Sequence, residues 1–156
     1  MLTCLFGYDE TVAQFVASLI PHCRRGFGAA RAMGVIDGEG RLIGGMVYHN
    51  WDAEAEIMEM SGAAVDPRWL TRRTLAAMYQ YPFLVCGCQM VVMRVPADNE
   101  RLLRQLAVFG YTFFRMPRLF GRHRDGVVCS LTAENWSSNK FNKKQTSAPE
   151  FREAAE

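Results

Sequence analysis

Residues 53–115 alternate strand-like and helix-like segments, and this alternation is the strongest constraint on the fold. A strand-like run ends at Val65-Asp66-Pro67, and a helical pattern follows it. A second strand then leads to a helix that begins with Asp98-Asn99, ends at Gly110 and precedes the strand-like run Tyr111-Thr112-Phe113-Phe114. Alternation of this kind indicates helices that connect strands of one sheet, some of which can lie parallel. The segment therefore predicts an α/β sheet.

The residues before this segment predict a helix and an antiparallel meander. The helix is expected over Asp9–Ile20, because apolar residues recur there at helical spacing and Asp9 can cap its start. Asp37-Gly38-Glu39-Gly40 is a turn sequence that would join strands over Met33–Ile36 and Leu42–His49. A further strand over Ala53–Val65 would pair next to this hairpin, so three consecutive antiparallel strands are expected.

The remaining elements have clear starts and stops. Asp66 is a good N-cap and Pro67 suits a first helical position, so a helix is predicted to begin at Pro67 and to be kinked or interrupted at Pro82. Met90–Met93 is a continuous apolar run, typical of a central strand that is covered on both faces. One more helix and two closing strands are expected over Asn99–Phe109, Tyr111–Met116 and Gly126–Leu131.

Composition restricts the class of protein. A chain of 156 residues with 49% hydrophobic and 22% charged residues suits one globular domain, and a net charge of +2 does not by itself indicate a nucleic-acid binder. The five cysteines have no zinc-site spacing, and their odd number argues against a disulfide scaffold. No metal site is therefore predicted.

The two ends of the sequence suggest a location and a domain boundary. The first residues have no signal-peptide pattern and no run is long enough to span a membrane, so we expect a cytoplasmic protein. From Ser137 onward polar residues dominate and large aliphatic residues vanish. We therefore predict one domain over residues 1–136 and a flexible polar tail over residues 137–156.

This order of elements resembles the acyl-CoA-binding half of the Gcn5-related N-acetyltransferase (GNAT) superfamily. In that family a valine and a proline lead from the central strand into a helix, as Val65 and Pro67 do here, and an Asn-x-x-Ala helix and a Gly-Phe strand follow. The corresponding residues are Asn99-Glu100-Arg101-Leu102 and Gly110-Tyr111. The resemblance implies a single α/β (α+β) domain whose mixed, mostly antiparallel sheet is flanked by helices. It also implies that the strand ending near Val65 and the strand Gln89–Val95 are parallel and splay apart, leaving a cleft for the pantetheine arm of acyl-CoA.

The resemblance also implies where acetyl-CoA, a co-substrate, would bind. In the family the loop after the central strand carries Arg/Gln-x-x-Gly-x-Gly/Ala, whose glycines let backbone amides approach the pyrophosphate at a helix N-terminus. The corresponding positions here hold Leu70, Arg73 and Leu75, so the motif is altered. Guanidinium and hydroxyl groups nearby can still hold phosphate, and the residues expected to bind the co-substrate are Ala64, Val65, Leu70, Thr71, Arg72, Arg73, Thr74 and Asn99. Alternatively, Arg68, Arg72 and Arg73 form only the solvated face of an amphipathic helix.

Acyl transfer from a thioester to an amine needs a deprotonated amine, a polarised carbonyl and a protonated leaving thiolate. Family members often take the base from a carboxylate near the central strand, and Glu59 is the best-placed carboxylate here. The tyrosine that often protonates the thiolate corresponds to Leu106, so Tyr111, Ser61 or a water would replace it. Glu59 could instead be a surface or salt-bridged strand residue. His49 is interpreted as the end of a strand, although its aromatic neighbours could line an acceptor pocket.

Basic residues surround Leu119-Phe120-Gly121; they are Arg115, Arg118, Arg122, His123 and Arg124. A basic loop with aromatic residues can hold phosphates and stack on bases, which makes nucleic acid an alternative partner. The leading hypothesis is an acyl-CoA-dependent N-acyltransferase that transfers an acyl group directly to an amine-bearing acceptor, with a homodimer as a candidate assembly. The alternatives are a degenerate GNAT-like binding domain and a phage-type accessory or DNA-modification protein.

Overall fold

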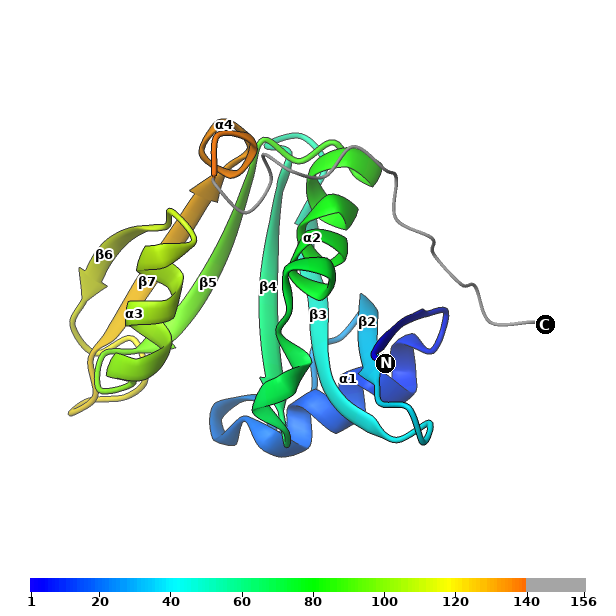
Figure 1. Cartoon of the computed structure of the whole chain (residues 1–156). Coiled ribbons are helices and arrows are strands. Elements are labelled where there is room, and N and C mark those ends of the chain that lie inside the picture. Colours follow the sequence, from blue (N-terminus) through cyan, green and yellow to red (C-terminus); the bar gives the residue numbers. More distant parts are fainter. Residues whose placement is uncertain (140–156) are drawn as a thin grey trace.

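The computed structural model describes residues 1–139, which form one seven-stranded sheet with helices on both faces (Figure 1). The strand order is β1-β2-β3-β4-β5-β7-β6, and neighbours are antiparallel except for the parallel pair β4 and β5. The predicted fold class is therefore confirmed. The strands are β1 (Thr3–Phe6), β2 (Ala30–Ile36), β3 (Leu42–Asp52), β4 (Ile57–Ala64), β5 (Met90–Pro96), β6 (Thr112–Met116) and β7 (Gly126–Thr132).

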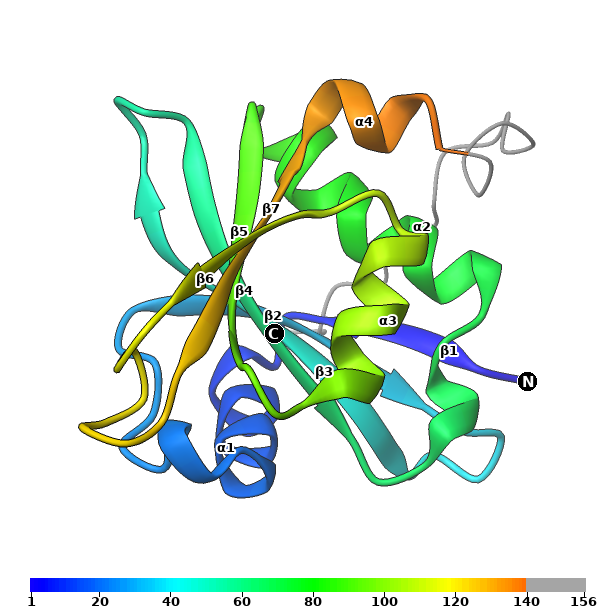
Figure 2. The same ribbon diagram turned by 90° about the vertical axis from the view of Figure 1, so that its left-hand side faces the viewer.

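Helix α1 lies on one face of the sheet, and α2 and α3 lie on the other (Figure 2). This arrangement divides the core in two. Val12 and Val16 of α1 pack with Val47 of β3, whereas Met78 and Tyr79 of α2 belong to a larger cluster on the opposite face. The α-helices of the described residues are α1 (Asp9–Leu19), α2 (Arg72–Gln80), α3 (Glu100–Val108) and α4 (Ala133–Ser137).

The N-terminal part follows the prediction with two differences. Tyr8, not Asp9, is the N-cap of α1, because the Asp9 carboxylate accepts a hydrogen bond of 2.8 Å from the Ala32 amide in β2. Residues 53–56 form a turn rather than part of a strand, so β4 begins only at Ile57. Asp52 stabilises this turn, since its Oδ1 accepts hydrogen bonds from the amides of Glu54 (3.1 Å) and Ala55 (3.0 Å).

The helix after β4 begins later than the sequence predicted. Asp66 caps only a short 3-10 helix over Pro67–Trp69, and α2 begins at Arg72. The extended backbone at Leu70 separates the two elements. At the far end the predicted disturbance is confirmed, because Pro82 lies in a π-helical turn over Tyr81–Val85.

Strand β5 is an interior strand, as predicted, but only one of its faces is fully covered. Val91, Met93 and Val95 are buried, whereas Val92 is half-buried and Arg94 is exposed. The apolar run therefore alternates like any strand with two different faces. Arg94 reaches the face of the sheet that carries α1.

Helix α4 completes the described domain. Trp136 is buried against Tyr79, with ring centroids 4.5 Å apart. The Asn139 side chain donates a 2.6 Å hydrogen bond to the Phe109 carbonyl, so ordered contacts continue past the predicted boundary at residue 136. The rest of the predicted tail, residues 140–156, lies outside the described residues. No helix within residues 1–139 has the length and apolar character needed to cross a membrane.

Candidate active site

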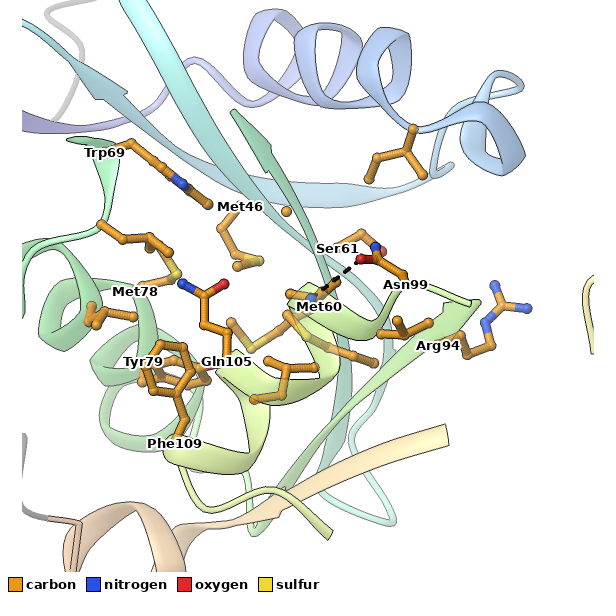
Figure 3. A pocket seen from close by; sticks show the side chains of 18 of the residues that line it. Met46, Met60, Ser61, Trp69, Met78, Tyr79, Arg94, Asn99, Gln105 and Phe109 are labelled. Carbon is orange, nitrogen blue, oxygen red and sulfur yellow. Dashed lines mark hydrogen bonds between the residues drawn. The ribbon is translucent and has the colours of Figure 1, made fainter. Parts of the chain in front are cut away.

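The candidate site lies where β4 and β5 separate. The two strands pair only at Ile57↔Met90, Met58↔Val91 and Glu59↔Val92. Beyond Glu59, no strand of the described chain pairs with β4 on this side, which confirms the predicted splay. A cavity of about 130 Å³, here called the inner cavity, occupies this fork between the sheet and helices α2 and α3 (Figure 3).

The inner cavity is apolar at one end and polar at the other. Its apolar walls include the flexible side chains of Met46, Met60, Met78 and Met93. Methionine side chains can adjust to the shape of a ligand because they are unbranched and polarizable. The polar lining includes His22, Ser61 and Arg94, and Figure 3 shows Ser61 and Arg94 at the end away from Tyr79 and Phe109.

A more open groove of about 420 Å³, here called the outer groove, adjoins the inner cavity. The same side chains line both spaces, namely Trp69, Leu70, Asn99, Leu102 and Gln105. The two spaces therefore share a wall, and together they are called the passage. Of the residues predicted to bind the co-substrate, Ala64, Val65, Leu70 and Asn99 line the outer groove.

Helix α3 begins at the wall of this groove. Asn99 is its N-cap, and Asn99 Oδ1 accepts a 3.3 Å hydrogen bond from the Leu102 amide. Arg101, in the first turn, also lines the groove and makes no ion pair within residues 1–139. The positive end of the helix dipole and a guanidinium group together favour an anion at this position.

The N-terminus of α2, by contrast, is closed by its own side chains. Thr71 Oγ1 accepts a hydrogen bond from the Thr74 amide (3.1 Å), and Thr74 Oγ1 accepts one from the Thr71 amide (2.8 Å). Two of the amides that would face a pyrophosphate are thus used within this capping box. The predicted residues Thr71, Arg72, Arg73 and Thr74 line neither the inner cavity nor the outer groove. Arg73 instead acts on Cys4 of β1, where its charge opposes the rise in the pKa that burial causes.

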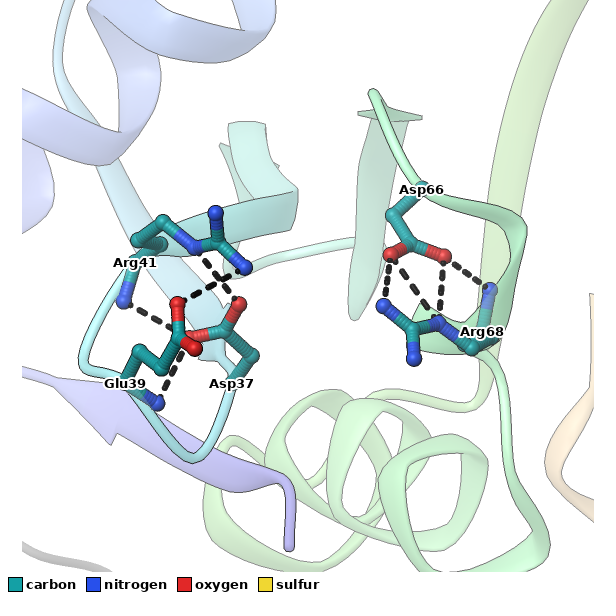
Figure 4. Close-up of polar contacts among 5 residues, drawn as sticks. All are labelled: Asp37, Glu39, Arg41, Asp66 and Arg68. Carbon is teal, nitrogen blue, oxygen red and sulfur yellow. Dashed lines mark hydrogen bonds and ion pairs between the residues drawn. The ribbon is translucent and has the colours of Figure 1, made fainter.

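The loop between β4 and α2 is held by Asp66 and Arg68 (Figure 4). The Asp66 carboxylate accepts a hydrogen bond from the Arg68 amide (2.9 Å) and pairs with its guanidinium group (2.6 Å). The side-chain hydrogen bond from Arg68 is the largest cause that lowers the pKa of Asp66 to about 2. Arg68 is therefore committed to shaping the loop. Figure 4 shows a similar arrangement in the β2–β3 turn, where Asp37 pairs with Arg41 (2.9 Å).

Buried polar side chains gather on the α1 face of the fork. His49 and Glu59 are two of the three buried polar or charged residues within residues 1–139, and they lie opposite each other in β3 and β4. His49 Nε2 lies 2.9 Å from Ser61 Oγ and 3.4 Å from Glu59 Oε2. Arg94 Nε lies 3.2 Å from Glu59 Oε1. The predicted catalytic residues Glu59 and Ser61 are thus close together, in a cluster with His49 and Arg94.

This cluster can hold and move a proton, but it is not a serine-hydrolase triad. Burial and the charge of Arg94 lower the pKa of His49, while Glu59 opposes the shift, so the imidazole is neutral near neutral pH. Ser61 and Glu59 both contact Nε2, whereas in a triad the carboxylate binds Nδ1 and leaves Nε2 for the serine. Glu59 would also have to accept a proton beside Arg94 in order to act as a base.

Two loops meet at the polar end of the inner cavity. The 3-10 helix Pro21–Cys23 carries His22, whose ring contacts the ring of Phe120 in the β6–β7 loop, with centroids 4.6 Å apart. Phe120 in turn packs over Gly126, where an added Cβ would come within 2.6 Å of its ring. Burial is the largest cause that lowers the pKa of His22, and the charges of Arg94 and Arg124 contribute. A neutral imidazole therefore lies near neutral pH at this polar end of the inner cavity, which is here called the polar mouth.

Tyr111, predicted as a catalytic acid, is buried and does not line the inner cavity. Its hydroxyl lies 2.7 Å from the hydroxyl of Tyr79, which does line the cavity. Burial raises the pKa of both groups, so both tyrosines keep their protons. Tyr111 can therefore reach the cavity only through Tyr79.

The basic loop between β6 and β7 is shaped by carboxylates. Asp125 accepts a hydrogen bond from the Arg118 amide (3.1 Å) and pairs with the Arg115 side chain (3.0 Å). Arg124 pairs with Asp98 at 3.3 Å. Much of the charge that suggested a nucleic-acid partner thus has an internal structural role.

These described residues have the fold of the GNAT-type N-acetyltransferases. The spermidine/spermine N-acetyltransferase SpeG from Vibrio cholerae superposes with a TM-score of 0.71 at 14% sequence identity, covering 87% of this chain and 97% of that chain. A dodecameric structure of spermidine N-acetyltransferase from the same organism gives a TM-score of 0.66 at 14% identity, covering 87% and 94%. Neither a protein-family profile nor a curated protein sequence matches the chain. At this identity the likeness shows the fold, and the names of these neighbours give the nucleic-acid alternative no support.

Sequence reasoning missed His22, Arg94 and Arg101 as site residues. Arg101 had a usable signal, because it follows Asn99 by two positions in a predicted first turn. His22 and Arg94 had none, since only the three-dimensional fold brings their segments to the same end of the fork. The contacts of His49 with Ser61 and Glu59 could not be predicted, because both partners lie in the adjacent strand.

Proposed function

We propose that the chain is an acyl-CoA-dependent N-acyltransferase that transfers an acyl group, acetyl in the simplest case, directly to an amine in a ternary complex. The observation that carries this proposal is the passage through the fork. It begins at the N-terminus of α3, continues between methionine side chains and ends at His22, Ser61 and Arg94. Acyl-CoA has a matching sequence of parts, with phosphates at one end, a long arm and a reactive thioester at the other end.

The residues of the passage fit this co-substrate in charge and polarity. Arg101 and the start of α3 would hold phosphate in the outer groove. The pantetheine arm would pass Asn99 and Leu102 into the inner cavity, and the thioester would lie near Ser61. Four residues predicted to bind the co-substrate do not line the groove, namely Thr71, Arg72, Arg73 and Thr74. In this proposal they would contact only a phosphate group that extends beyond the groove.

The transfer forms a C–N bond and breaks a C–S bond, and the amine proton must leave while the thiolate gains one. The neutral imidazole of His22 lies at the mouth where an amine would arrive, so it is the proposed proton acceptor. Glu59, through His49 and Ser61, is the alternative acceptor that the sequence predicted. Ser61 or a water would protonate the thiolate, because Tyr79, to which Tyr111 is hydrogen-bonded, lies at the other end of the inner cavity. SpeG, by its name, transfers acetyl to an amine of spermidine or spermine, which supports an amine acceptor.

Calorimetric titration of the full chain with acetyl-CoA and with CoA tests this proposal. Arg101→Ala should weaken binding by about tenfold or more, the loss expected for one charge-assisted contact. Arg104→Ala is the matched control, because Arg104 lies on the same helix, is exposed and pairs with Glu100 (3.9 Å) outside the passage. Equal affinity of the wild type and Arg101→Ala would contradict the groove assignment, and no CoA binding by the wild type would contradict the proposed function.

A second candidate is a GNAT-like domain that binds CoA without transferring its acyl group. The observations that favour it are the capping box at α2, the altered glycine motif and the ion pair between Glu59 and Arg94. Tight binding of acetyl-CoA without release of CoA in the presence of any amine would support this second function.

A further inference from the structure

The polar mouth of the passage, on the α1 face, is surrounded mainly by basic groups. Arg94 of β5 and His22 line this end of the inner cavity, and Arg124 of the β6–β7 loop is near enough for its charge to act on His22. Two carboxylates accompany them, and both are already ion-paired, Glu59 with Arg94 and Asp98 with Arg124. The charge of Glu59 also reaches His22, where it opposes the charges of Arg94 and Arg124.

Arg94 has hydrogen-bonding capacity left. Its hydrogen bond to Glu59 comes from Nε (3.4 Å), and its two terminal nitrogens make no hydrogen bond within residues 1–139. Its side chain is 48% exposed, and Figure 3 shows the guanidinium group beyond the end of the inner cavity. Arg124 is also 48% exposed, and its one ion-pair partner among residues 1–139 is the exposed Asp98. Planar guanidinium groups with free N–H donors suit carboxylate and phosphate.

The charges of Arg94 and Arg124 act on the same side chain. Both act on His22, where they add to the effect of burial on its pKa. Arg118 and Arg122, further along the β6–β7 loop, add positive charge and form no side-chain ion pair in the part of the chain that the structure describes. A mouth with this balance attracts anions and repels polycations.

On the basis of the acyltransferase function, we propose that the acceptor is a small amine that also carries an anionic group, a carboxylate or a phosphate, bound by Arg94 and Arg124. The contact between His22 and Phe120 restricts the mouth, which favours a small molecule over a protein surface. Such an acceptor would place its amine beside the imidazole of His22. This class differs from the polycationic spermidine and spermine named for the Vibrio cholerae enzyme.

Matched pairs of amines test this inference, because each pair differs in the anionic group. The pairs are L-phenylalanine with 2-phenylethylamine, and O-phosphoethanolamine with ethanolamine; spermidine serves as the polycation. CoA release from acetyl-CoA gives kcat/KM for each, and calorimetry without acetyl-CoA measures binding of each amine to the full chain. For at least one anionic amine, kcat/KM should exceed that of its neutral partner and that of spermidine by about tenfold or more. The two pairs distinguish an acceptor with a carboxylate from one with a phosphate.

Variants connect this preference to the named residues. Arg124→Gln should reduce the preference and leave the fold intact, since it leaves only the exposed Asp98 unpaired. Arg94→Gln would leave Glu59 buried without its cation, so the double variant Arg94→Gln with Glu59→Gln removes both charges together. It should abolish the preference. Arg104→Gln is the control and should leave the preference unchanged.

The outcomes separate the inference from the function on which it rests. If neutral amines or spermidine are acylated as well as the anionic ones, the acceptor class is wrong and the acyltransferase function stands. If acetyl-CoA does not bind, the proposed function fails. Direct binding of the amines then still decides the inference, because binding of an anionic amine that depends on Arg94 and Arg124 supports it, and its absence overturns it.

Discussion

The N-termini of α2 and α3 both lie beside the fork, yet they differ in whether they present donors to a ligand. Thr71 and Thr74 satisfy each other's amides at α2, and Thr74 Oγ1 also donates to the Trp69 carbonyl (2.7 Å). At α3 only the Asn99 side chain caps the helix, and Arg101 extends along the outer groove. The comparison teaches that the helix N-terminus implied by the sequence resemblance can be capped by its own side chains while the first turn of a second helix lines a groove.

The largest effect is expected from Thr74→Val. The substitution keeps the shape of the buried side chain but removes its hydroxyl, so the Thr71 amide and the Trp69 carbonyl lose their partner. The free energy of unfolding should fall by about 2 kcal/mol, measured by urea denaturation. CoA affinity should stay unchanged at a temperature where the variant is folded. Thr74→Ser keeps the hydroxyl and serves as control; a large loss of CoA affinity in Thr74→Val would restore a ligand role to α2.

The next prediction compares arginines at the two helices directly. Arg101→Ala should weaken CoA binding by about tenfold, equivalent to about 1.4 kcal/mol, whereas Arg72→Ala with Arg73→Ala should weaken it by less than about twofold. The reason is that Arg101 lines the groove and the other two arginines do not. Calorimetry at two salt concentrations measures both. The reverse order of effects would show that the pyrophosphate binds at α2, as the resemblance implied.

A smaller effect is expected at the cap of α3. Asn99→Ala removes the acceptor for the Leu102 amide, and loss of such a cap typically costs about 1 kcal/mol of stability. Because Asn99 also lines the passage, acetyl-CoA affinity should fall as well. Asn99→Asp keeps the cap and should retain the stability. If Asn99→Ala lowers stability without any change in affinity, Asn99 is a structural cap alone.

The smallest effect concerns the pH dependence of stability at His49, beside Ser61. The pKa of His49 is lowered below 6.5 in the folded protein, so the unfolded chain binds the proton more readily. Above pH 6.5 His49 is neutral in the folded and the unfolded chain and does not change the free energy of unfolding. Below pH 6.5 the unfolded chain takes up the proton first, so the free energy of unfolding falls. Urea denaturation between about pH 7 and about pH 5 measures the slope, and His49→Gln should reduce it. An unchanged slope in His49→Gln would show that other groups dominate.

The order of most elements could be predicted because their boundaries are marked by local chemistry. The turn Asp37-Gly38-Glu39-Gly40, the N-cap region at Asp98-Asn99 and Gly110 separate segments with clear periodicity. Strand β1 and helix α4 were missed, since four or five residues are too few to show a period. The start of α2 was misplaced because Asp66 and Pro67 also suit the short 3-10 helix that they form.

The site could be predicted only where one segment carries its residues. Glu59, Ser61 and Asn99 were proposed from their places in strand and helix, whereas the contact between His49 and Glu59 depends on the β3–β4 register. The turn at residues 53–56 hid that register, because these residues continue the polar and apolar pattern of the strand. Arg94 reaches Glu59 only after a crossover connection brings β5 beside β4.

The short pairing of β4 and β5 also leaves a backbone edge within the protein. From Met60 to Ala64, β4 continues beside β3 but has no strand of the described chain on its other side. An exposed strand edge is a template on which another extended chain can form main-chain hydrogen bonds. Under the proposed acyltransferase function, the pantetheine arm, which contains amide groups in an extended chain, would lie in the fork as a substitute strand. Recognition of this kind depends on backbone direction and spacing, and the fold can therefore keep it while the side chains around it change.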